Sequence, residues 1–243
     1  MMYREPKFLP GGDSALFVEF GDVIDPAINL RVKQLKQAIE GEKPAGAIET
    51  VPTYRSLLIY FDPLKISHAT LKDTLYRLTQ PKEENKIPKP RVIEIPTVYD
   101  GEFGPDLEFV AEHNHLSASE VIEIHTGTPY LIYMIGFLPG FPYLGGMSPR
   151  IAAPRLDTPR TKIPAGSVGI AGNQTGIYPV ESPGGWRIIG RTPLNIFDPG
   201  HEPPALFQAG DYLKFVSISP EQFTRIKEAV AQGTYITKAR TME

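Results

Sequence analysis

The feature that most constrains the fold is the segment 130–198, in which glycine and proline repeatedly interrupt short apolar runs. Aromatic and β-branched residues lie between these interruptions, as in Gly136-Phe-Leu-Pro-Gly-Phe-Pro-Tyr-Leu-Gly-Gly146. Disordered low-complexity chains lack such interleaved apolar residues. A closed or folded-over sheet with many tight corners needs them. The segment therefore predicts a mainly β domain, and its shaped surface is the first place to look for function.

The first 80 residues carry a different pattern. Apolar, strand-like runs predict three strands, at residues 15–20, 47–51 and 56–61. Two helices are predicted to begin at the capping residues Asp25 and Ser67, and Gly41 is the expected end of the first. Leucines 71, 75 and 78 recur at helical spacing in the second. This order predicts a small α+β sandwich domain over 1–80, in which two helices cover one sheet face.

Residues 81–90 are polar, charged and proline-rich, which is typical of an extended interdomain linker. A second domain is expected over 91–243. It begins with a strand at 91–98, continues through short helices near 105–113 and 117–125, and closes with a strand at 211–218 and a helix capped by Ser219. The predicted fold class is therefore an α+β N-terminal sandwich domain followed by a mainly-β barrel domain.

Composition excludes several classes of protein. The chain has 243 residues, a net charge of −3 and no cysteine. That charge argues against nucleic-acid binding, and no apolar run approaches the roughly 18 residues of a membrane span. The N-terminal residues lack the apolar core of a signal peptide. The absence of cysteine excludes disulfides, a thiol nucleophile and a cysteine-ligated zinc. We therefore expect a cytoplasmic protein without nucleic-acid or membrane partners.

Positive charge gathers in the glycine- and proline-rich region. The stretch from Gly127 to Gly200 holds six cations and three anions, whereas the whole chain has a net charge of −3. A locally basic surface favours an anionic ligand or an acidic partner, and a random distribution of solvated charges is the other interpretation. The cations that could serve an anionic site are Arg160, Lys162, Arg187 and Arg191.

Searches for catalytic motifs are mostly negative. No Gly-Lys pair exists, so there is no Walker A loop, and His113 and His115 have no carboxylate pair nearby, so no metal site is expected. Glycines at every third residue over 166–172 favour strands bent around a barrel corner, or a cradle of backbone N–H groups for a phosphate or carboxylate. Ser167 is a turn serine or a nucleophile.

His125 and five aromatic residues remain open. His125 ends a capped helix just before the aromatic strand, so it either faces the concave surface or gains only from the helix dipole. The aromatic residues are separated by glycine and proline rather than by a helical or strand period, so some belong to a core and some to a rigid docking surface. They are Phe137, Phe141, Tyr143, Tyr178 and Trp186.

Taken together, the motifs resemble one family over nearly the whole chain. They are Gly136 to Gly146, Pro159-Arg160, Pro164 to Gly172, Gln174 to Pro179, Ser182 to Trp186 and Gly190 to Pro193, with Gly12 to Ala15, Gly101 to Asp106, Glu120 to His125 and Ala209 to Asp211 outside them. The chain resembles the 5-oxoprolinase B-subunit family. That family is also called the allophanate hydrolase subunit 1 family and includes the Bacillus sporulation kinase A inhibitor.

The resemblance implies a cyclophilin-like β-barrel for residues 91–243. It implies a role as the B subunit of an ATP-dependent 5-oxoprolinase, which opens 5-oxoproline to glutamate with two partners: a carboxyltransferase-like sister, the C subunit, and the barrel-type A subunit. ATP with Mg would be used in the assembled complex, and no cofactor is expected on this chain alone. The alternative is an inhibitor that blocks autophosphorylation of a sensor histidine kinase, and one protein could combine both roles. A purely structural subunit is a third interpretation.

The chemistry of lactam opening selects the candidate site residues. Phosphorylation of the amide oxygen by ATP needs cations and N–H donors around developing negative charge. The predicted catalytic residues are His125, Arg160, Lys162, Arg187 and Arg191. The predicted substrate- or anion-binding residues are Ala165, Gly166, Ser167, Gln174, Gly184 and Gly185. The predicted partner-docking residues are Phe137, Pro139, Phe141, Pro142, Tyr143, Tyr178 and Trp186.

Overall fold

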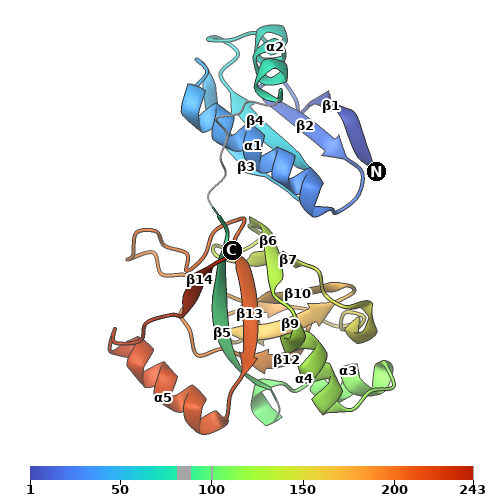
Figure 1. The fold of residues 1–243 in the computed structure, drawn as a ribbon, viewed down its shortest axis with the longest axis vertical. Helices are drawn as coiled ribbons and strands as arrows, with labels where there is room; N and C mark the ends of the chain where they lie inside the picture. The colour runs from blue at the N-terminus through green and yellow to red at the C-terminus, as the bar shows by residue number, and fades with distance from the viewer. Residues whose placement is uncertain (81–88, 100, 243) are drawn as a thin grey trace. The chain divides into compact units, whose positions relative to one another are not determined.

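The computed structural model describes residues 1–80, 89–99 and 101–242. The chain separates after residue 88 into two compact units, which we call unit 1 and unit 2 and describe separately (Figure 1). Most of the predicted linker at 81–90 lies outside the described residues.

The described part of unit 1 is an antiparallel sheet covered by two helices. Its elements are β1 (Met2–Pro10), β2 (Ala15–Gly21), α1 (Pro26–Glu42), β3 (Ala47–Pro52), β4 (Ser56–Phe61) and α2 (His68–Leu78). The strands lie in the order β1-β2-β4-β3. Buried side chains from β2, β4 and both helices, such as Phe20, Leu35 and Leu75, form one core. Both helices therefore pack on the same face of the sheet, which gives the α+β arrangement expected from the apolar periodicities.

The ends of these elements follow local chemistry. The Asp25 side chain accepts hydrogen bonds from the Ala27 and Ile28 amides at 2.8 and 3.2 Å, and Ser67 accepts one from Thr70 at 3.1 Å. The prediction that Gly41 ends the first helix was wrong, because α1 continues through it and Lys43 takes the left-handed conformation, with φ 49°. Strand β1 was not predicted, because none of its side chains is fully buried and they carry no clear alternation.

Unit 2 is built around a larger sheet. Its strands are β5 (Arg91–Tyr99), β6 (Tyr130–Ile135), β7 (Pro142–Gly145), β8 (Arg160–Ile163), β9 (Ser167–Ala171), β10 (Gln174–Ile177), β11 (Ser182–Gly184), β12 (Arg187–Arg191), β13 (Tyr212–Ser217) and β14 (Ala239–Thr241). Its helices are η1 (Gly101–Phe103), α3 (Leu107–His113), α4 (Ala118–Gly127), η2 (Pro149–Ile151) and α5 (Pro220–Ala231). Capping boxes at Ser117 and Ser219 begin α4 and α5 as expected.

The main sheet of unit 2 nearly closes into a barrel. Among the described residues its strands run β10-β9-β12-β5-β13-β6-β7, and β14 pairs with β5. Strands β7 and β10, at the two ends of this order, lie beside each other without a hydrogen-bonded ladder. Strands β8 and β11 form a separate pair. In Figure 1, α3 and α4 lie together against one side of the barrel and α5 lies against another.

Two layers of side chains cover opposite faces of the β9–β10–β12 part of this sheet. Because neighbouring residues on a strand point to opposite faces, Val168 and Ile170 enter the main core with α3 and α4, whereas Ala171 enters a second, aromatic cluster. On β12, Ile189 and Ile188 divide in the same way. The glycine- and proline-rich segment supplies the strands and the loops of this second layer.

Candidate functional site

The second layer is an aromatic cluster centred on Phe141. Ring centroids of Tyr143, Tyr178 and Trp186 lie 5.4, 5.7 and 5.5 Å from that of Phe141, each in an edge-to-face arrangement. Ile163, Ala171 and Ile188 complete the buried cluster. Phe141 is only 2% exposed, and Tyr178 and Trp186 are buried with it. The cluster is therefore a small hydrophobic core, held by edge-to-face ring contacts and apolar burial.

A glycine on the sheet makes room for these rings. A Cβ at Gly176 would lie 2.9 Å from Phe141 Cζ and 3.1 Å from Trp186 Cζ3. On β10, the reason for glycine is therefore close packing of aromatic side chains on the sheet surface.

Most of the residues predicted to dock a partner are not available on the surface. Phe141, Pro142, Tyr178 and Trp186 are buried, and Tyr143 is half-buried. The prediction that these aromatic residues are surface anchors was wrong for this chain on its own. Gly176 leaves room on the sheet, so the rings pack into the apolar cluster. The loop tip is different: Pro139 is exposed, and Phe137 is 70% exposed with a left-handed φ of 63°. Its ring still meets the Phe141 ring at a centroid distance of 5.7 Å.

Two of the predicted catalytic arginines converge on one buried carboxylate. Arg160 Nη1 and Nη2 donate to Asp106 Oδ2 and Oδ1, both at 2.9 Å. The Ile188 amide donates to Asp106 Oδ2 at 2.6 Å, and Arg187 Nη1 lies 3.8 Å from Oδ1. Arg187 also lies 3.5 Å above the Phe109 ring and donates to the Pro154 carbonyl. These contacts join α3, β8 and β12, so both guanidinium groups are engaged in holding the fold.

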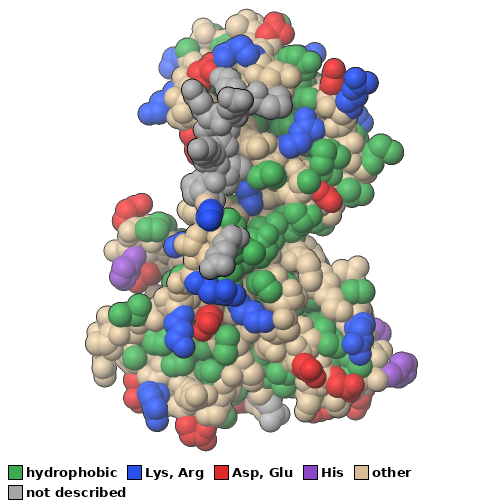
Figure 2. Space-filling view, viewed as in Figure 1, with side chains coloured by type: hydrophobic (Ala, Val, Ile, Leu, Met, Phe, Trp, Pro, Cys, Tyr) green, Lys and Arg blue, Asp and Glu red, His purple; other side chains and the backbone are tan. Residues whose placement is uncertain are grey.

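The other two predicted cations lie elsewhere on the surface. Lys162 Nζ makes an exposed ion pair with Glu181 at 3.0 Å. Arg191 Nε donates to the Ala165 carbonyl at 3.0 Å. Arg191 also lines a hollow of about 590 Å³ beside α5, together with Lys227, Glu102 and Glu228. Figure 2 shows Lys and Arg side chains interspersed with Asp and Glu on the visible face of unit 2. The four predicted cations therefore do not gather around one cavity.

The glycine-rich turn before β9 uses its N–H groups internally. Gly166 N donates to the Tyr178 carbonyl at 2.7 Å, and Ser167 N donates to the Pro164 carbonyl at 3.3 Å. Gly166 has φ 80°, and a Cβ there would lie 2.3 Å from the Thr192 carbonyl oxygen. The turn is thus a tight structural corner, and its prediction as an anion cradle was wrong for these two amides.

The remaining predicted binding residues are spread over three elements. Ala165 is exposed next to the turn, and the buried Ser167 starts β9. Gln174 starts β10 and is half-buried. Gly184 pairs with Arg160 in the β8–β11 ladder, and the Gly185 carbonyl accepts the Leu156 amide at 2.8 Å.

His125 is completely buried, and both of its ring nitrogens are hydrogen-bonded. Nδ1 lies 2.7 Å from the Tyr99 hydroxyl and Nε2 lies 2.8 Å from Thr175 Oγ1. Because Thr175 donates to the Gly169 carbonyl at 3.1 Å, its oxygen must accept from Nε2–H. The Tyr99 hydroxyl then donates to Nδ1. The neutral ring is fully hydrogen-bonded and completely buried, so the interpretation in which His125 faces the concave surface was wrong.

Burial determines the charge state of this histidine. Desolvation lowers the pKa of His125 to about 3, and burial raises the pKa values of the neighbouring Tyr99 and Tyr130. The Phe215 ring packs against it with centroids 4.4 Å apart, and in the described part of the chain no carboxylate forms an ion pair with it. His125 is therefore neutral in the folded protein at physiological pH.

Unit 2 should lose stability as pH falls below about 6.5. An unfolded histidine binds a proton near pH 6.5, whereas folded His125 does not until about pH 3. Each pH unit in this window should cost about 1.4 kcal/mol, or about 2 kcal/mol between pH 6.5 and 5. Urea unfolding followed by Trp186, the only tryptophan, measures this. His125→Gln does not titrate and should show a shallower pH slope, and equal slopes would contradict the assignment.

Comparison with known proteins matches most of the chain to one family. A family profile described as "Carboxyltransferase domain, subdomain C and D" matches residues 6–207. The 5-oxoprolinase B subunit of Bacillus subtilis is 48% identical over 228 residues, which cover 89% of this chain and 95% of that protein. The chain belongs to the 5-oxoprolinase B-subunit family. The resemblance stated from the motifs is thereby confirmed.

Solved structures share the fold of this chain. A conserved uncharacterized protein from Pyrococcus horikoshii is 55% identical, with a TM-score of 0.54 over 89% of this chain and all of that one. The urea amidolyase of K. lactis is 23% identical, with a TM-score of 0.78, and shares the fold over 98% of this chain and 16% of its own. The motif resemblance implied that the sister protein is carboxyltransferase-like. The profile match shows that this chain also resembles a carboxyltransferase domain.

The sequence did not reveal the residues that hold Arg160, Arg187 and His125 in place in this chain. Asp106 stands before α3, where an acidic residue usually caps the helix, yet its side chain makes no capping bond. Its partners lie 54 and 82 residues along the chain, so no local spacing could reveal them. Tyr99 and Thr175 were missed for the same reason.

Across the described residues, no helix is sufficiently long and apolar to span a bilayer.

Proposed function

We propose that this protein is the B subunit of an ATP-dependent 5-oxoprolinase, which opens 5-oxoproline to glutamate together with sister subunits. The observation that carries the proposal is the 48% identity to the B. subtilis 5-oxoprolinase B subunit over 95% of that protein. A relative of this similarity and coverage is strong support for a shared molecular role, although fold alone would not be.

The site geometry supports an active site shared with a sister protein. Arg160 and Arg187 are engaged with Asp106, and His125 is buried and neutral. Within residues 1–80, 89–99 and 101–242 we find no nucleophile, base and anion-binding group that converge on one cavity. The K. lactis urea amidolyase also supports a shared site, because the segment that matches this chain is 16% of a much longer polypeptide.

The nucleotide is proposed to bind to the assembled complex. The amides of Gly166 and Ser167 are already donated to carbonyl groups, so the glycine-rich turn does not fit a nucleotide phosphate. The hollow at Arg191 and Lys227 also contains Glu102 and Glu228, whose carboxylates would oppose a triphosphate. No step of the reaction is therefore assigned to a nucleotide held by the described residues of this chain.

Reconstitution tests the shared site. We expect the purified chain to show no ATP-dependent hydrolysis of 5-oxoproline alone and to support it when the sister subunits are added. Robust hydrolysis by this chain without partners would contradict a shared site. A reconstituted complex that turns over equally well without this chain would contradict its role as a required component.

Arg191 is the predicted catalytic residue best placed to reach a partner, because it lines the open hollow beside α5. Arg191→Gln should lower kcat/KM of the reconstituted enzyme by about a hundredfold, the lower end of the effect typical when one charge-stabilising donor is lost. Arg225→Gln removes an equal charge from an exposed position on α5 outside this lining and should change kcat/KM by less than about twofold. Equal activities of the two variants would show that Arg191 does not take part.

The kinase-inhibitor alternative stays a prediction. None of the relatives found bears on it, and most of the aromatic residues predicted to dock on a kinase are buried. An autophosphorylation assay with a cognate kinase, in which Phe137→Ala relieves inhibition, would support it.

A further inference from the structure

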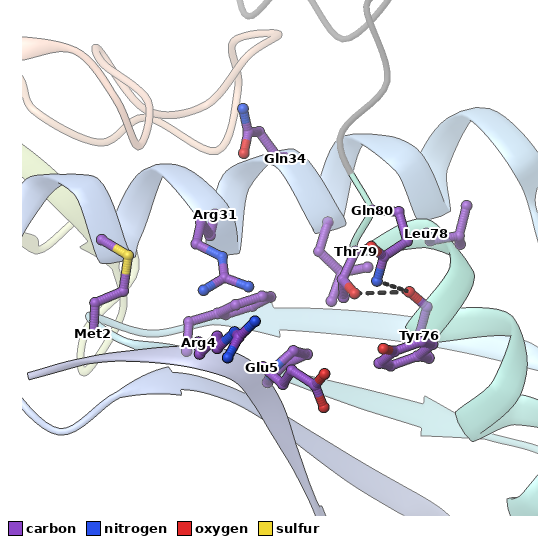
Figure 3. A pocket seen from close by; sticks show the side chains of 12 residues that line it. Met2, Arg4, Glu5, Arg31, Gln34, Tyr76, Leu78, Thr79 and Gln80 are labelled. Carbon is purple, nitrogen blue, oxygen red and sulfur yellow. Dashed lines mark hydrogen bonds between the residues drawn. The ribbon is translucent and has the colours of Figure 1, made fainter.

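Unit 1 contains a hollow that the proposed enzymatic role does not use. It has a volume of about 550 Å³ and lies between β1, α1 and the C-terminal end of α2 (Figure 3). Its size suits a small organic molecule. Phe20, Leu35 and Leu78 contribute apolar lining. The side chain of Arg31 extends into the hollow from α1, and that of Arg4 lies on the β1 side.

Arg31 is a half-buried cation without a carboxylate partner in the described part of the chain. Its Nη1 donates to the Tyr3 carbonyl at 2.8 Å, and its guanidinium carbon lies 4.8 Å from the centre of the Phe20 ring. No described carboxylate lies within ion-pairing distance of it. In unit 2 the half-buried Arg160 and Arg187 both have Asp106, whereas the half-buried Arg191, like Arg31, donates to a backbone carbonyl. Burial lowers the pKa of Arg31, as expected for a charge that lacks compensation.

The rest of the lining keeps the hollow positive. Arg4 adds a second guanidinium, and Glu5 contributes one carboxylate, which is exposed and forms no ion pair with a described cation. Gln34 provides an amide that can donate hydrogen bonds. The Tyr76 ring forms part of the wall. The hollow therefore combines a planar guanidinium that has unused N–H donors with the exposed apolar surface of Tyr76 and Met2.

We propose that this hollow binds a small organic carboxylate with a flat, apolar body. The guanidinium of Arg31 presents parallel donors that match the two oxygens of a carboxylate, and Arg4 adds attraction from the strand side. The exposed Tyr76 and Met2 pack against the body of the ligand, and the buried Phe20 ring supports the Arg31 guanidinium. A phosphate would bring more negative charge close to Glu5 and would leave the apolar lining uncovered. This site is independent of the proposed enzymatic role.

Nuclear magnetic resonance titration of the full ¹⁵N-labelled chain tests the proposal with benzoate as the probe. We expect millimolar benzoate to shift the backbone amides of Arg31, Gln34 and Tyr76 and to leave unit 2 unchanged. Benzyl alcohol has the same ring without the charge and should shift them far less. Arg31→Gln should weaken benzoate binding by about tenfold or more, and Arg4→Gln by about threefold or more. Arg225→Gln, on α5 in unit 2, is the matched control and should change binding by less than about twofold.

Several results would overturn the proposal. The first is the absence of benzoate-dependent shifts. The second is binding of benzyl alcohol or inorganic phosphate that is as tight as binding of benzoate. The third is binding of benzoate by the Arg4 and Arg31 variants that is as tight as binding by the unmodified chain. Arg31 also contacts the Tyr3 backbone, so the dispersion of the unit 1 amide signals must show that its variant folds. Arg4 is exposed on β1, so its variant remains informative even if Arg31→Gln unfolds unit 1.

Discussion

Replacing Phe141 by alanine should lower the free energy of unfolding of unit 2 by about 3–5 kcal/mol. The side chain is 2% exposed and its ring contacts those of Tyr178 and Trp186 edge to face. Its removal leaves a cavity against Gly176, which has no side chain to fill the space. Urea denaturation followed by Trp186 fluorescence, with circular dichroism as a second probe, measures the change.

Phe137→Ala is the matched control for this experiment. The two phenylalanines are four residues apart, but Phe137 is 70% exposed. Its removal should change the free energy of unfolding by less than about 1 kcal/mol. If Phe141 were a surface anchor for a partner, as its sequence context suggested, the two variants would be equally stable. That outcome would show that the aromatic cluster does not stabilise unit 2.

Replacing Asp106 by alanine should cost about 3 kcal/mol. The substitution leaves Arg160 and Arg187 without their shared carboxylate and leaves the Ile188 amide without its acceptor. Removing one member of a buried ion pair is costly because the remaining charge stays desolvated. Arg160 is about one-third exposed, so water relieves part of that cost and the expected value lies at the lower end of the usual range. Trp186 fluorescence is a suitable probe, because the Trp186 carbonyl accepts from Arg160 at 3.4 Å.

A double-mutant cycle identifies the mechanism. Arg160→Ala alone should also destabilise unit 2, and the effects of the Asp106 and Arg160 substitutions should be non-additive by more than about 1 kcal/mol. Asp157→Ala removes an exposed carboxylate that forms no ion pair with the cations of the described residues, and it should change stability by less than about 0.5 kcal/mol. Additive effects, or an Asp106 variant as stable as the Asp157 variant, would contradict a shared structural cluster. Arg160 would then again be a candidate for direct contact with substrate.

Local chemistry explains what could be predicted from the chain alone. Capping residues and apolar periodicity act over a few neighbouring residues, so α1, α2, α4 and α5 begin at the expected Asp25, Ser67, Ser117 and Ser219. Strands β2, β3 and β4 of unit 1 and β5 and β13 of unit 2 were predicted from their apolar or alternating side chains, whereas the strands within 130–198 were expected only as a region. Strands β1 and β14 were not predicted, because none of their side chains is fully buried and only pairing with β2 and β5 defines them.

The candidate site depended on contacts between residues that are distant in the chain. The sequence by itself determined that residues 130–198 combine rings, glycines and cations. Only the tertiary structure decided which rings are buried, because the sheet surface at Gly176 admits Phe141 and Trp186 and leaves Phe137 outside. It also decided that Arg160 meets Asp106 and that His125 meets Thr175, across 54 and 50 residues. Such pairings depend on how the strands assemble, and burial then sets the charge and accessibility of each group.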